Sequence, residues 1–186
     1  MTRRARSWRC VCLMAARSLA TALLTSVFAF GGCGQNRHRV VDAFPTARVA
    51  APWILEGEVW SGTFEDAAPA LGDDAETWKK FSPTRVWLAR YTREGDPARV
   101  LTVRCFAFDS PETARAAFEV FRPPLAKPLR AGDVGCWTEC GVLFQWQRLV
   151  FDIFGDDVSW GSEVNSSVMA AIIARRMPAG VPENPQ

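Results

Sequence analysis

Two apolar runs joined by a short turn constrain the fold more than any other part of the chain. The runs "TRVWLARYTR" and "ARVLTVRCFAF" are separated by "EGDP", a combination typical of a turn between two strands. In the second run, Leu101, Val103 and Cys105 alternate with Thr102, Arg104 and Phe106. Because successive side chains of a strand point to opposite faces, the pattern predicts a β-hairpin with these two sets on opposite faces.

The flanking segments add helices and further strands. "DSPETARAAFEVF" predicts a helix with Ser110 as N-cap and Pro111 at the first helical position. "CGVLFQWQRLVFDIFG" predicts two more strands with a tight turn near Gln147, and "WILEGEVWSG" predicts an earlier one. A short helix is expected between Gly72 and Phe81, and a last helix before residue 177 with an apolar stripe of Trp160, Val164, Val168 and Ile172. The order predicts an α+β fold, with a mostly antiparallel sheet of about five to six strands and helices packed on one face.

The N-terminal residues predict a targeting signal. Five arginines precede "LATALLTSVFAF", which has the length of a signal-peptide apolar region and is short for a membrane-spanning helix. The apolar run ends in "FGGC", which resembles the lipobox of bacterial lipoproteins. The resemblance implies cleavage before Cys33 and attachment of lipid to its sulfur. An uncleaved membrane anchor and a plain secretory signal are the alternatives.

This interpretation divides the chain and changes its charge. We expect a signal peptide at 1–32, a lipid-anchored tether at 33–52, an α+β domain at 53–177 and a disordered tail at 178–186. Removing the five arginines of the signal from the 22 basic residues leaves 17, against 20 acidic residues. Since nucleic-acid binding needs a basic face, we expect no nucleic-acid partner. We expect the protein to be anchored in the cell membrane or the outer membrane, with its domain facing the periplasm or the exterior.

Three cysteines remain in the predicted domain: Cys105, Cys136 and Cys140. In an exported protein, "CWTEC" predicts a structural disulfide between Cys136 and Cys140 across a hairpin. A bond from Cys105 to either of them is an alternative pairing. The same motif could serve as a redox dithiol, although its three intervening residues depart from the usual two. No zinc set can be completed, so neither a metal nor another cofactor is expected.

Acidic and aromatic residues supply the remaining candidates. Two acidic groups could bind cations, although helix capping explains them more simply; they are Asp73, Asp74 and Glu76, and Asp152, Asp156 and Asp157. If helices cover one face of the sheet, four aromatic residues could form a ligand surface on the other, or a second core layer under the N-terminal segment. These residues are Trp87, Tyr91, Phe106 and Phe108.

Residues 98–155 resemble uncharacterised domains of bacterial lipoproteins and periplasmic proteins. The similar segments are "VRCFAFDSPETARAAF", "AGDVGCW" and "GVLFQWQRLVFDIFG". The resemblance implies a fold and no activity. We therefore expect a lipid-anchored cell-envelope protein with a non-enzymatic domain that binds a protein or small ligand. The alternatives are an exported thiol-redox protein using Cys136 and Cys140, and a hydrolase with paired carboxylates.

Overall fold

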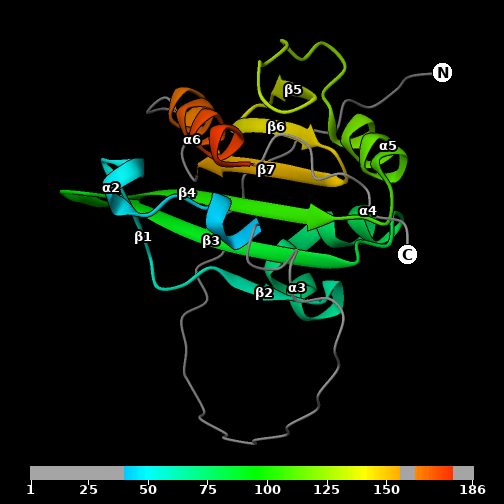
Figure 1. Ribbon diagram of the computed structural model, residues 1–186, viewed down its shortest axis with the longest axis horizontal. Helices are drawn as coiled ribbons and strands as arrows, with labels where there is room; N and C mark the ends of the chain where they lie inside the picture. The colour runs from blue at the N-terminus through cyan, green and yellow to red at the C-terminus, as the bar shows by residue number, and fades with distance from the viewer. Residues whose placement is uncertain (1–39, 156–161, 178–186) are drawn as a thin grey trace, which may run out of the picture.

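The computed structural model describes residues 40–155 and 162–177. The predicted signal peptide, Cys33, Trp160, the acidic pair Asp156 and Asp157, and the tail at 178–186 lie outside the described residues. The described part is an α+β fold built on an antiparallel sheet (Figure 1), which confirms the predicted class. The sheet has seven strands rather than five to six. They are β1 (Trp53–Leu55), β2 (Trp60–Gly62), β3 (Arg85–Arg93), β4 (Asp96–Ala107), β5 (Val134–Trp137), β6 (Gly141–Trp146) and β7 (Leu149–Gly155).

The strand order is β1-β3-β4-β7-β6-β5, with β2 also paired to β3. The predicted β3–β4 hairpin forms, and β5, β6 and β7 make a meander that returns to pair β7 with β4. Gln147 takes a positive φ of 50° at the turn between β6 and β7, where the sequence predicts a tight turn. The single strand expected at residues 53–62 is instead two short strands on either side of Gly57, whose φ is 76°. Glycine tolerates this backbone conformation, and it lets the chain bend between β1 and β2.

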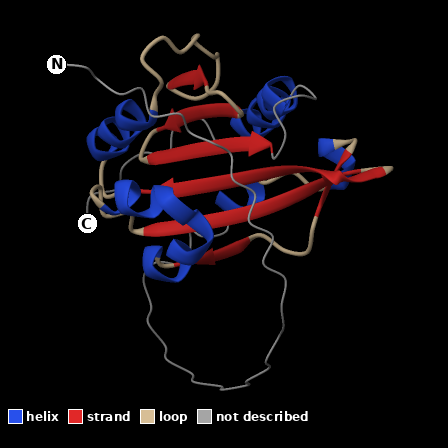
Figure 2. Ribbon diagram, turned by 180° about the vertical axis from the view of Figure 1, so that it is seen from behind, coloured by secondary structure: helices blue, strands red, loops and turns tan. Residues whose placement is uncertain are grey.

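Helices cover both faces of the sheet, not one face as the sequence predicted. The described helices are α2 (Ala47–Ala50), α3 (Phe64–Leu71), α4 (Ala75–Lys79), α5 (Pro111–Phe121) and α6 (Ser162–Arg176), with a 3₁₀ turn η1 (Gly72–Asp74) before α4. In Figure 1, α6 and α2 lie in front of the sheet, and Figure 2 shows α3 and α4 over its back. Because both faces of the central strands are apolar, each needs its own cover.

Two apolar cores result, one on each side of the sheet. The front core contains Tyr91, Leu101, Val103 and Cys105 of the central hairpin, under α6 and residues 40–50. The back core contains Phe106, Phe108 and Trp78, under α3, α4 and α5. Trp78 stacks between Phe106 and Phe121, with ring centroids 3.9 and 3.8 Å away. These aromatic contacts attach α4 and α5 to the back of the sheet.

Helix α3 is a feature that the sequence interpretation missed. Thr63 and Asp66 form a capping box at its start, in which each side chain bonds the backbone of the other residue. Pro69 lies inside this helix and hides the helical signal, because proline usually interrupts a helix interior. Helix α5 begins as predicted, since the Ser110 hydroxyl accepts a hydrogen bond from the Thr113 N–H.

The apolar stripe predicted for the last helix is wrong at Val168. Val168 is 51% exposed, whereas the buried side follows the spacing of Ser166, Met169, Ala170, Ile173 and Met177. Ser166 and Ala170 are small, so α6 can approach β6 and β7 closely. The helix therefore carries apolar residues on two sides, and only its packing in the tertiary structure determines which side is buried.

Part of the predicted tether belongs to the domain. Residues 40–43 are helical, and Ala43, Phe44 and Ala50 are buried in the front core. The Tyr91 hydroxyl donates a hydrogen bond to the Pro45 carbonyl (3.2 Å). Residues 40–52 are thus not a free linker, because the apolar side chains among them pack against the front of the sheet. The domain begins by Val40 rather than at residue 53.

Candidate functional site

The predicted cysteine pair does not form a disulfide. No disulfide joins Cys105, Cys136 and Cys140 in the described residues. In the β5–β6 hairpin, Cys136 is opposite Leu143 and Trp137 is opposite Val142, so Cys140 lies in the turn and not across from Cys136. A cross-strand disulfide needs directly opposed residues, and this register does not provide them.

The alternative pairing with Cys105 fails for a different reason. Cys105 belongs to the front core and Cys136 to the back core, so the sheet separates the two sulfur atoms. Burial raises the pKa of Cys105 well above its usual value, and burial is also the largest cause that raises the pKa of Cys136 to about 11. Since the thiolate is the reactive form, both thiols are poor nucleophiles at neutral pH.

The four aromatic residues predicted as a candidate ligand surface are all buried. Trp87 and Tyr91 lie in the front core, and Phe106 and Phe108 lie in the back core. Each is less than 5% exposed. The ligand-surface interpretation is therefore wrong for these residues. The structure favours the other interpretation, that aromatic residues form core layers, and it divides them between two cores.

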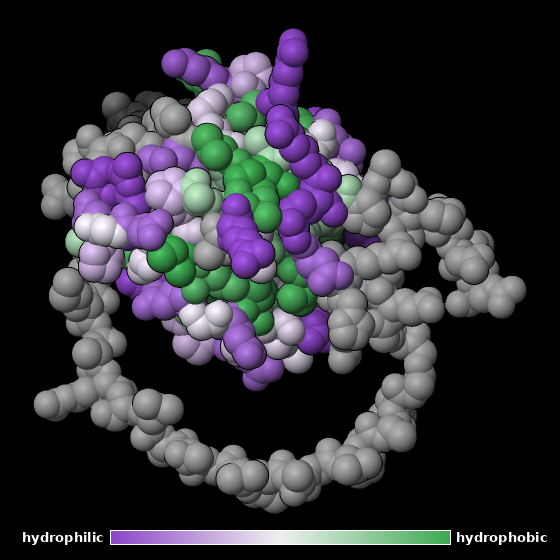
Figure 3. Space-filling model, turned by 60° about the vertical axis from the view of Figure 1, so that its left-hand side comes forward, coloured by the Kyte–Doolittle hydropathy of each residue, from purple (hydrophilic) through white to green (hydrophobic). Residues whose placement is uncertain are grey.

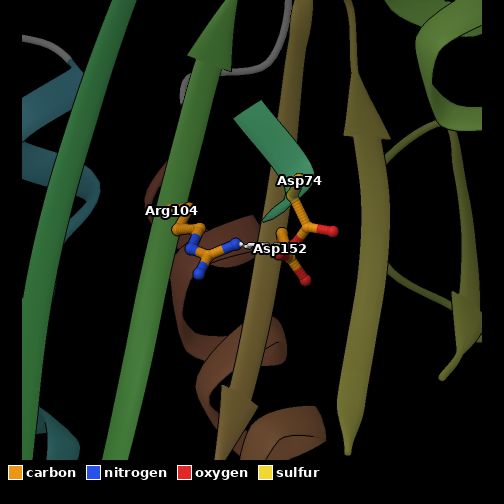
Figure 4. A network of polar contacts seen from close by, with 3 residues as sticks. All are labelled: Asp74, Arg104 and Asp152. Atoms are coloured by element: carbon orange, nitrogen blue, oxygen red, sulfur yellow. Dashed lines mark hydrogen bonds and ion pairs between the residues drawn. The ribbon is translucent and has the colours of Figure 1, made fainter. Parts of the chain in front are cut away.

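A charged cluster on the back of the sheet brings together residues that the sequence analysis had not grouped. Arg104 of β4 and Asp152 of β7 are directly opposed in the strand register. Figure 4 shows that Asp74 of η1, which packs over the back of the sheet, points toward the same guanidinium. Arg104 Nη1 donates a hydrogen bond to Asp74 Oδ2 (3.1 Å) and lies 3.7 Å from Asp152 Oδ2. We call these three residues the Arg104 cluster.

The Arg104 cluster is largely shielded from solvent. The side chains of Arg104, Asp152 and Asp74 are 12, 18 and 28% exposed. The guanidinium carbon also lies 4.4 Å from the centroid of the Phe154 ring, a cation–π contact. Two carboxylates thus share one cation in a partly apolar setting. Such a cluster holds its members in fixed positions but leaves one negative charge uncompensated.

The pKa of Asp152 reflects its burial within this cluster. The pKa of Asp152 is raised from 3.8 to about 6: burial is the largest cause, the Arg104 guanidinium partly offsets it, and the Asp74 carboxylate adds to it. Asp152 therefore gains a proton just below neutral pH. Chemically, the cluster can take up and release a proton, and it joins η1 to the sheet.

The cluster combines one member from each predicted acidic group. Asp74 stands at the N-cap position of α4 but makes no side-chain capping bond, because its carboxylate bonds Arg104 instead. Within the described ranges, no three His, Cys, Asp or Glu side chains gather as a metal ion would require. The signal that could have found the cluster is the opposite charge at positions 104 and 152, but it depends on a β4–β7 pairing that is not local in sequence.

Comparison of the chain with models of protein families, with curated proteins and with solved structures finds no match. Among the described residues, no helix is both long enough and apolar enough to cross a membrane.

Proposed function

We propose that the chain is a lipid-anchored cell-envelope protein, held at the membrane through Cys33, whose domain acts by binding rather than by catalysis. The observation that carries the proposal is the position of "FGGC" relative to the domain. Six residues separate Cys33 from Val40, where the packed part of the chain begins. The apolar run and its cysteine thus precede, in the sequence, the first residue of the described core, as expected of a signal that is removed from the mature chain.

The chemistry of the domain supports a binding role. Two of its cysteines have raised thiol pKa values, which weakens the alternative of a redox dithiol that uses Cys136 and Cys140. The carboxylates of the Arg104 cluster contact a guanidinium on the same face of the sheet, and this arrangement joins η1 to the strands. A structural role accounts for the cluster without a substrate. We therefore assign the chain no reaction and place its activity at its surface.

The test is the chemical identity of the mature N-terminus. We expect mass spectrometry of the membrane-extracted protein to find Cys33 as the first residue, modified with lipid. The Cys33→Ala variant should lose the modification and accumulate as the uncleaved precursor. Cys12→Ala is the matched control, because that cysteine is removed with the signal and its loss should leave the mature mass unchanged. An unmodified Cys33, or a mature chain that begins elsewhere, contradicts the proposal.

A further inference from the structure

One outer layer of the domain joins the N-terminal segment to the last helix. Helix α2 contacts α6. At the C-terminal end of α6, Arg176 Nε donates a hydrogen bond to the Asp42 carbonyl (2.9 Å). Both contacts lie on the front of the sheet, as Figure 1 shows for α2 and α6. The first described residues and α6 thus form one surface.

This surface exposes apolar side chains. Val41, Val49 and Val168 are 38, 46 and 51% exposed, and they come from the N-terminal segment, α2 and α6. Figure 3 turns the side of the molecule that carries α2 forward and shows apolar residues gathered in one patch among hydrophilic ones. Single exposed valines are ordinary, whereas a patch bordered by polar residues is typical of an interaction surface.

The same surface carries positive charge. Arg48, Arg175 and Arg176 are exposed. These segments contain two acidic residues, Asp42 and Glu163. Asp42 is exposed, and Glu163 is twelve residues before Arg175, which is about 18 Å along α6 at the ordinary rise of a helix. The chain after the predicted cleavage site has more acidic than basic residues, so this surface differs in charge from the average of the domain. We call the three valines and three arginines the N-terminal face.

The distance to Cys33 determines what this face can meet. With six intervening residues, the Cα atoms of Cys33 and Val40 are at most about 25 Å apart. A compact domain of this length has a diameter of about 35 to 40 Å. If Cys33 is anchored in the bilayer, the surface around Val40 stays near the lipid headgroups, because the linker is too short for the opposite face to take its place.

We propose that the N-terminal face lies against the membrane surface, with the three valines among the headgroups and the three arginines on anionic phosphates. This inference rests on the proposed lipid anchor and adds the orientation of the domain. Exposed apolar residues combined with arginines are the chemistry that binds interfacial anionic lipid. The back of the sheet, with α3 and α4, then faces away from the bilayer.

The test measures the depth of two matched positions in the lipidated protein. Val49→Cys and Val120→Cys are each made with Cys140→Ser, labelled with a fluorophore, and reconstituted in vesicles of phosphatidylethanolamine and phosphatidylglycerol with a headgroup nitroxide. Val120 is 57% exposed and lies on α5, at the opposite end of the domain in Figure 1. We expect quenching at position 49 to be at least about threefold stronger than at position 120. Equal quenching in lipidated protein overturns the proposed orientation.

A second pair of variants tests the arginines. Arg48→Ala with Arg175→Ala should reduce quenching at position 49 in phosphatidylglycerol vesicles, and the affinity of the face for this lipid should fall about fivefold per arginine. Lys79→Ala with Lys80→Ala is the matched control, because it removes the same charge from exposed positions of α4 and its C-terminal end on the back. Equal effects of the two pairs contradict the role of the arginines. Mass spectrometry of the same samples reports the lipid on Cys33, so failure of the anchor is distinguished from failure of the orientation.

Discussion

Replacing Asp152 with asparagine should stabilise the domain at neutral pH. Asparagine has nearly the same shape as aspartate but carries no charge. In the native structure, Asp152 is mostly buried and shares Arg104 with Asp74. The guanidinium keeps its 3.1 Å hydrogen bond to Asp74 in the variant, so no buried cation is left without a partner. The substitution therefore removes the uncompensated charge and little else.

The size of the effect follows from the raised pKa of Asp152. A rise from 3.8 to about 6 corresponds to about 3 kcal/mol of free energy that folding loses when the carboxyl is ionised. Because the side chain remains 18% exposed, we expect Asp152→Asn to gain about 1–3 kcal/mol at pH 8. The cost is small at pH 4, close to the unfolded pKa of 3.8, grows as the pH rises to the folded pKa of about 6, and is fully present above it.

Urea unfolding of both proteins at pH 4, 5, 6 and 8 measures this difference. The free energies of unfolding should differ by less than about 1 kcal/mol at pH 4, separate between pH 4 and 6, and differ by a nearly constant amount above that, with the variant more stable. Asp96→Asn is the control, because Asp96 is 43% exposed in an ion pair with Arg99. This control should change stability by less than about 1 kcal/mol. A difference between Asp152→Asn and the natural protein that does not depend on pH, or a loss at pH 8, refutes the argument.

Three further predictions concern the core, the thiols and the β6 strand. Tyr91→Phe removes the hydrogen bond to the buried Pro45 carbonyl and should cost about 1–2 kcal/mol, measured by urea unfolding. Thiol titration of the lipidated mature protein at pH 8 should find Cys140 reactive in the native state, because Cys105 and Cys136 are buried. In denaturant without reductant, all three domain cysteines should react. Fewer than three reactive thiols in denaturant would indicate a disulfide. Gly141→Ala should lower the melting temperature sharply, because the new methyl group would overlap the Ile153 carbonyl oxygen of β7. Gly57→Ala, with open space around it, should cost only about 1 kcal/mol.

Local signals in the sequence predicted local structure correctly. The "EGDP" turn and the flanking alternation predict the β3–β4 hairpin, and Ser110 with Pro111 predicts the start of α5. Turn and capping preferences depend on a few neighbouring residues, so they can be read without the rest of the fold. The α+β class follows from the order of these elements, and the structure confirms it.

Register and pairing were predicted less well. The predicted disulfide depended on a turn of residues 137–139, whereas the actual turn is 138–140. Gly141 sets this register, because the start of β6 lies so close to the backbone of β7 that no side chain fits. A change of one residue in a strand moves every side chain to the other face. Cys136 therefore lies in the back core, and the predicted pair does not form.

The sequence by itself determined the class of the fold and most of the segments that become hairpins and helices, since each depends on composition or on neighbours within one turn. The targeting signal at the N-terminus stays a prediction from the sequence. Only the tertiary structure decided which side of α6 is buried, that residues 40–50 close the front core, and that Arg104 meets Asp74 and Asp152. These features depend on contacts between distant segments. The free energy of the first two comes from burying apolar area between distant segments, and the charge cluster depends on which strands pair, so no local pattern records them.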